Sequence, residues 1–156
     1  MSHETHLRRA LSLAETHSAD GRHGPFGAVV VLNGEVVGEG WNQVVDGADP
    51  TAHAEITAIR NACRALGTHA LNGATLYCSC EPCPMCLSAA YWARISRVVH
   101  SASARDAASA GFDDAWILTE LKQEWPQRKM ERVQLLEDEG RQVFQRWNEN
   151  PRKVPY

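Results

Sequence analysis

Four side chains in two short segments have the types and spacing of a catalytic metal centre. The segments are Thr51-Ala52-His53-Ala54-Glu55 and Cys80-Glu81-Pro82-Cys83-Pro84-Met85-Cys86. His53, Cys83 and Cys86 would supply three zinc ligands and leave the fourth tetrahedral position to water, whereas a structural zinc site normally closes with a fourth Cys or His. This combination of His-x-Glu with Pro-Cys-x-x-Cys indicates hydrolytic chemistry at zinc.

Both segments are expected at the beginning of a helix. Cys83 and Cys86 are three residues apart, so near a helix N-terminus their sulfurs face one point. His53 and Glu55 are two apart and share no helix face, but in the first turn both side chains reach around the helix end. We expect the metal where two helix N-termini meet, because their partial positive charge favours thiolates.

Glu55 is the predicted catalytic residue. Zinc lowers the pKa of its water toward roughly 7, and a carboxylate near the metal that is not a ligand accepts the proton. The carboxyl group then delivers a proton first to a ring nitrogen and later to departing ammonia, as water adds to an amidine-type carbon. The backbone N–H groups of Ala54 and Cys83, at the two helix starts, are expected to be further donors to the substrate.

Each half of the pattern has a simpler explanation when it is taken alone. A single Cys-x-x-Cys after a strand also occurs in disulfide oxidoreductases, and His-x-Glu is common by chance. A zinc module that only binds a partner is a further alternative, although such a module has no need of Glu55 beside an open metal position. We expect packing or surface roles for the other thiols and histidines, which are Cys63, Cys78, Cys80, His3, His6, His17, His23, His69 and His100.

Length and composition indicate one globular domain over residues 1–156. The formal net charge of -3 gives no general attraction to nucleic acid and favours a small-molecule substrate. No apolar run approaches membrane-spanning length, and the first residues lack the continuous apolar block of a signal peptide. The five clustered cysteines do not resemble a disulfide framework, so we expect a cytoplasmic protein.

The hydrophobic pattern predicts helices and strands that alternate around the two motifs. Phe26–Leu32 and Glu35–Trp41 read as strands joined by Asn33-Gly34, a typical hairpin turn. Further strands are expected at 74–79, 97–101 and 132–136, and helices at 3–19, after 50–51 up to 66, and at 84–93, 104–110, 114–125 and 140–148. This alternation predicts an α/β fold, a three-layer α/β/α sandwich with a mixed five-stranded sheet.

The chain resembles the cytidine deaminase-like superfamily, and within it the bacterial guanine deaminases. The resemblance runs nearly from end to end, and it is most specific at residues 25–31, 49–55, 80–86, 91–94, 110–114 and 156. It implies the cytidine deaminase-like fold and a zinc cofactor. The implied reaction is hydrolysis of guanine to xanthine and ammonia, a step of purine catabolism.

The resemblance also implies roles for individual residues. Phe26 and Trp92 would line the pocket around the purine, and Asn42 would hydrogen-bond its edge. The family exchanges its C-terminal segment within a homodimer, so Asp114 and Tyr156 would complete the neighbouring subunit's site.

Other substrates remain open at this point. Guanosine or an amino-triazine could replace guanine while the metal chemistry stays unchanged, since pocket shape decides the substrate. The tRNA adenosine deaminases share both metal motifs, but their substrate is a polyanion, which the negative net charge of this chain disfavours.

Overall fold

The structure, a computed structural model, describes residues 2–156. The chain forms two compact units, one ending at Leu118 and the other comprising Thr119–Tyr156. In the first unit the elements are α1 (His3–Ser18), β1 (Gly27–Leu32), β2 (Glu35–Trp41), α2 (Ala54–Leu66), β3 (Thr75–Cys80), α3 (Pro84–Trp92), β4 (Arg97–Ala102) and α4 (Ala104–Ser109). Helix α5 (Ala115–Lys122) spans the boundary, and the second unit holds a short 3₁₀ helix, η1 (Trp125–Gln127), and α6 (Glu137–Glu149).

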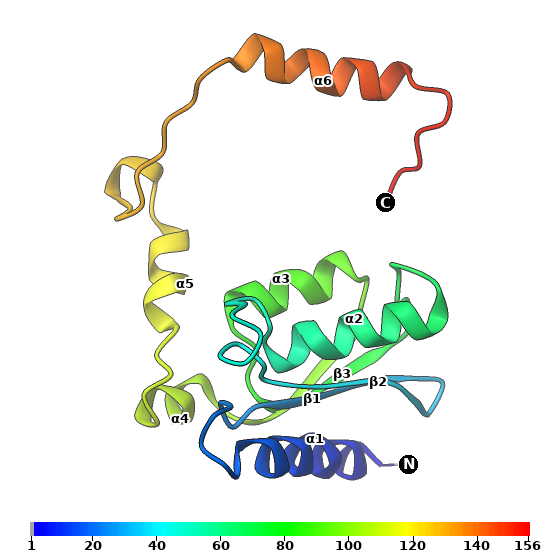
Figure 1. The fold of residues 1–156 in the computed structure, drawn as a ribbon, viewed down its shortest axis with the longest axis vertical. Helices are drawn as coiled ribbons and strands as arrows, with labels where there is room; N and C mark the ends of the chain where they lie inside the picture. The colour runs from blue at the N-terminus through cyan, green and yellow to red at the C-terminus, as the bar shows by residue number, and fades with distance from the viewer. Residues whose placement is uncertain (1) are drawn as a thin grey trace. The chain divides into compact units, whose positions relative to one another are not determined.

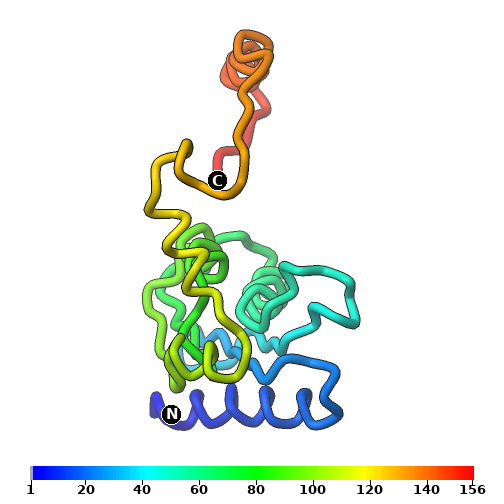
Figure 2. The backbone as a smooth tube through the Cα atoms, turned by 90° about the vertical axis from the view of Figure 1, so that its left-hand side faces the viewer, coloured from blue at the N-terminus to red at the C-terminus, as the bar shows by residue number. Residues whose placement is uncertain are grey.

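A mixed sheet with the order β2-β1-β3-β4 is the centre of the first unit. Strand β1 pairs antiparallel with both β2 and β3. Strand β3 pairs parallel with β4, and the crossover helix α3 connects the two strands. Both views place α1 on one face of the sheet and α2 and α3 on the other (Figures 1 and 2). Because β1 is antiparallel to β2 and β3, its start and the ends of those two strands lie at the same sheet edge, the one at which these strands begin or end.

Small residues let α2 lie directly against β2. A Cβ atom added to Gly40 would be 2.3 Å from the Ala54 carbonyl oxygen, and one added to Gly38 would be 2.4 Å from that of Ala58. Contacts this short are possible only with glycine, because a methyl group would overlap the helix backbone. The N-terminus of α2 is thus held close to the sheet edge where β2 ends.

Most of the expected elements are confirmed within a few residues, but the fifth strand is wrong. The sheet of the described residues has four strands, and Arg132–Leu136 is not among them. The alternating apolar residues of that segment are typical of a strand, but a strand also needs a neighbour to pair with. Within residues 2–156 the structure also contains no helix with the length and apolar character needed to cross a bilayer.

Candidate active site

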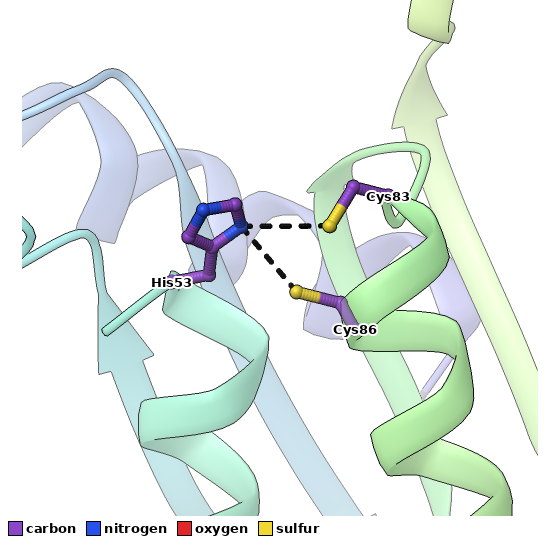
Figure 3. A group of neighbouring side chains, drawn as sticks. All are labelled: His53, Cys83 and Cys86. Atoms are coloured by element: carbon purple, nitrogen blue, oxygen red, sulfur yellow. Dashed lines mark hydrogen bonds between the residues drawn. The ribbon is translucent and has the colours of Figure 1, made fainter. Parts of the chain in front are cut away.

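Two helix N-termini bring the predicted ligands together at the sheet edge. His53 is the N-cap residue of α2, and Cys83 is the N-cap of α3, with Cys86 in the first turn of that helix. Nδ1 of His53 lies 3.6 Å from Sγ of Cys83 and 3.5 Å from Sγ of Cys86 (Figure 3). Within the part of the chain that the structure describes, these three form the one cluster of His, Cys or acidic side chains with the spacing to share a metal ion.

The spacing of the three donor atoms fits zinc. At its usual distances, about 2.3 Å to sulfur and 2.0–2.1 Å to nitrogen, a tetrahedral zinc ion separates a sulfur ligand from a nitrogen ligand by about 3.6 Å. The two Nδ1–Sγ distances of 3.6 and 3.5 Å match this separation. One imidazole and two thiols are also a donor set that zinc prefers.

The two thiols of the cluster have opposite pKa shifts. Hydrogen bonding from Cys86, against the opposing effect of burial, lowers the pKa of the Cys83 thiol to about 4. The same hydrogen bond, together with burial, raises the pKa of Cys86. Hydrogen bonding with Cys83 also raises the pKa of His53. Of the two thiols, Cys83 is therefore the one that ionises more readily.

Glu55 lies beside the cluster without belonging to it. Its side chain is only 7% exposed, and its Oε2 accepts a hydrogen bond from Sγ of Cys86 at 3.5 Å. Burial is the main cause that raises the pKa of this carboxyl group. A buried carboxyl group with a raised pKa holds a proton more readily than an exposed one, which suits it to acid-base chemistry.

A cavity of about 590 Å³ opens beside this group and belongs entirely to the first unit. It is lined by His53, Glu55 and Cys83, and also by Phe26, Asn42 and Asp114. Asn42 is buried and accepts a hydrogen bond from the Val44 backbone N–H through Oδ1, at 3.3 Å. Burial raises the pKa of Asp114, and the nearby Cys83 adds to this effect.

Three of the residues with predicted roles are not in the cavity lining. Ala54, whose predicted role is that of its backbone N–H, follows His53 as the first residue of α2 and is fully buried. Trp92 ends α3 with 63% of its surface exposed, outside the cavity lining. Tyr156 belongs to the second unit and is 76% exposed. Asp114, in contrast, lines the cavity of its own chain, although the resemblance implies that it completes a neighbour's site.

The cavity wall also contains residues for which the sequence predicts no functional role. Phe112 lies edge-on to Phe26, with ring centroids 5.0 Å apart, and so extends the aromatic surface. His23, expected in a structural or surface role, lines the cavity as well. Phe112 lies within a stretch that carries the family resemblance, whereas His23 has no partner at ligand spacing that would have pointed to it.

Comparisons with known proteins agree with this geometry. Residues 1–102 match the family described as the cytidine and deoxycytidylate deaminase zinc-binding region. The chain is 47% identical to guanine deaminase of Bacillus subtilis over 156 residues, all of both chains. The X-ray structure of guanine deaminase from Bacillus subtilis superposes with a TM-score of 0.96, covering 100% of this chain and 99% of that one. A tRNA-specific adenosine deaminase of Agrobacterium fabrum is 47% identical over 103 residues, 65% of this chain and 67% of that protein.

The pKa shifts predict how the affinity for zinc depends on pH. Zinc bound by these three residues would have to displace the Cys86 proton and would require a neutral His53, and the pKa values of both groups are raised. Protons therefore compete with the metal, and the apparent affinity falls as pH decreases, by about tenfold per pH unit for each proton released. Between pH 8 and pH 6 we expect a loss of about 100-fold or more, measured by competition with a chromophoric chelator. An affinity that does not change over this range would show that the ligands are not these groups.

Proposed function

This chain belongs to the zinc-binding cytidine and deoxycytidylate deaminase family and to the branch that contains the Bacillus subtilis guanine deaminase, and we propose that it hydrolyses guanine to xanthine and ammonia. The observation that carries the proposal is the position of Glu55 between a zinc-type donor cluster and a cavity that has aromatic and amide groups on its wall.

We propose that His53, Cys83 and Cys86 hold a zinc ion. Zinc at this position supplies a Lewis acid that lowers the pKa of water. Two thiolates and a neutral imidazole would balance its charge, and the N-termini of α2 and α3 favour the negative charge of the thiolates. All five cysteines of the chain are free thiols, as zinc ligation in the reducing cytoplasm requires, so we also propose a cytoplasmic location.

Glu55 would move the protons of the reaction. Its buried carboxylate takes a proton from the attacking water and gives it to the ring nitrogen beside C2 of guanine. Glu55 would then take the proton of the hydroxyl group now on C2 and give it to the exocyclic nitrogen, so that the C2–N bond breaks, ammonia leaves and C2 becomes a carbonyl carbon. The raised pKa of Glu55 suits this role, because a carboxyl group with a higher pKa holds a proton more readily between taking it up and giving it away.

The cavity wall is suited to a planar base. Phe26 and Phe112 provide an apolar, aromatic surface for the ring. Asn42 has its Oδ1 occupied by the Val44 N–H, which leaves its amide N–H groups to donate to acceptor atoms on the base edge. We also propose that the backbone N–H of Ala54, at the start of α2, is a further donor.

Charge favours a free base over a nucleic acid. Besides Glu55, three acidic side chains line the cavity, namely Glu81, Asp113 and Asp114. The guanidinium of Arg22, also in the lining, lies 2.7 Å from the carboxylate of Asp46. A phosphate group at this opening would meet mainly negative charge, so a tRNA substrate is the weaker alternative.

We further propose that the protein is a homodimer with an exchanged C-terminal segment. Residues 119–156 contain no buried residue, although the segment carries large apolar side chains, among them Leu135, Val143, Phe144 and Trp147. A segment with so much exposed apolar surface is expected to dock on another surface. A second copy offers one, since Tyr91 and Trp92 of α3 are also exposed. Tyr156 would then reach the neighbouring subunit's cavity.

The first test of the proposed function measures ammonia release from zinc-loaded protein. We expect turnover of guanine and none of adenine, cytosine or cytidine, while guanosine tests whether the cavity admits a ribose. Glu55→Gln should bind an equal amount of zinc but lose at least about 10³-fold in kcat, because general acid-base catalysis contributes about 10²–10⁴-fold in each role.

The result for Glu55→Gln separates the alternatives. A variant that keeps its activity would rule out Glu55 as the proton carrier. A wild-type protein that binds zinc and deaminates none of the five compounds would favour tRNA as substrate or a structural zinc module.

The exchange of the C-terminal segment predicts complementation between two inactive variants. Glu55→Gln lacks the proton carrier, and Tyr156→Ala lacks the proposed contact with the neighbouring cavity. In a refolded equimolar mixture, half of the dimers are mixed and each has one intact site, so activity should return to about a quarter of the wild-type value. If Tyr156 acts within its own chain, or has no role, mixing restores no activity beyond that of the separate variants.

A further inference from the structure

We infer that Asp46 is a positioning residue for substrate binding, because its carboxylate ties together two loops that form one wall of the active-site cavity. The inference rests on the proposed function for the identity of the bound base. The two loops are the 20–24 loop, between α1 and β1, and the 42–49 loop, between β2 and α2.

The carboxylate of Asp46, on the 42–49 loop, contacts two consecutive residues of the 20–24 loop. Its Oδ1 accepts a hydrogen bond from the Arg22 guanidinium at 2.7 Å, and its Oδ2 lies 3.2 Å from Nε2 of His23. Arg22 and His23 line the cavity on the 20–24 loop, as Val44 and Val45 do on the 42–49 loop. Asp46 is therefore a link between two parts of the same wall.

Each loop is also hydrogen-bonded within itself. In the 42–49 loop, the Gly47 N–H donates to the Gln43 carbonyl at 2.9 Å, and the Asp49 N–H donates to that of Val44 at 3.1 Å. In the 20–24 loop, the Arg22 N–H donates to the Asp20 carboxylate at 3.0 Å. Each loop thus has a defined shape of its own, and the side chain of Asp46 sets their relative position.

The link continues into the residues that would contact the base. Val44, two residues before Asp46, donates its N–H to Oδ1 of Asn42 and so orients the amide. On the other loop, Gly24 lies so close that an added Cβ would be 3.1 Å from the Phe26 ring and 3.4 Å from Cγ of Asn42. A shift of either loop would therefore displace Asn42, Phe26 or both.

His23 depends on Asp46 for its place in the wall. Among the described residues, Nδ1 of His23 is a buried side-chain atom that has no hydrogen-bond partner. The contact of Nε2 with Asp46 is then the polar interaction that holds the ring there. Without the carboxylate both ring nitrogens would lack a partner, and a half-buried imidazole in that state is expected to move toward water.

These contacts predict an effect on binding rather than on the chemical step. Glu55 and the proposed metal ligands lie at the starts of α2 and α3, whereas the Asp46 carboxylate is paired with Arg22 and His23 of the 20–24 loop. Asp46→Ala should raise KM for guanine by about fivefold, which is the size expected for the loss of a partly exposed ion pair. It should change kcat by less than about twofold. Zinc content should stay the same.

Three further variants distinguish positioning from a general loss of structure. Asp46→Asn keeps one acceptor oxygen and should fall between the wild type and Asp46→Ala. His23→Gln retains a donor near the Nε2 position and should stay near the wild type, whereas His23→Ala should resemble Asp46→Ala. Glu39→Ala is the matched control, because Glu39 pairs with Arg9 between β2 and α1, outside the cavity lining, and should leave KM unchanged.

Hydrogen exchange followed by mass spectrometry provides a readout that needs no substrate. In Asp46→Ala, but not in Glu39→Ala, amides in peptides covering 20–26 and 41–49 should exchange faster than in the wild type. An unchanged KM in Asp46→Ala, an equal rise in Glu39→Ala, or unchanged exchange in both peptides would overturn the inference. If the wild type does not turn over guanine, the proposed function fails, and the exchange result alone decides whether Asp46 ties the loops.

Discussion

One imidazole nitrogen and two sulfurs must meet within the reach of a single metal ion, and the fold is organised around this requirement. The three donors come from the N-termini of α2 and α3, which lie on the same face of the sheet and meet at one of its edges (Figure 1). Gly38 and Gly40 allow α2 to approach β2 closely enough for His53 to reach the cysteines. Bulkier residues at these positions would separate the donors and remove the metal site.

The same convergence creates the charge balance of the site. Two thiols, one imidazole and the buried carboxyl group of Glu55 are packed together, and their pKa values shift in different directions as a result. A divalent cation held by His53, Cys83 and Cys86 would relieve the repulsion between negative groups and, on the proposed mechanism, would leave Glu55 free to carry protons.

Each half of the donor cluster could be predicted from the sequence because the geometry within that half is local. Cys83 and Cys86 are one helical turn apart, and His53 and Glu55 share another first turn, so spacing alone indicates their arrangement. The cavity wall could not be predicted in this way. His23 and Asp46 meet through two irregular loops, and no spacing rule relates them. The prediction of a strand at Arg132–Leu136 is wrong because alternation of apolar residues does not show whether a partner strand is present.

X-ray absorption spectroscopy of the zinc-loaded protein tests the central claim most directly, because it counts the ligand atoms around the metal. The account predicts two sulfurs at about 2.3 Å and two lighter atoms at about 2.0–2.1 Å, one from His53 and one from solvent. Cys83→Ser should reduce the sulfur count to one, and Cys80→Ser should leave it at two. Three or four sulfur ligands in the wild-type protein would contradict an open catalytic site formed by His53, Cys83 and Cys86. A lower sulfur count in Cys80→Ser would contradict it as well.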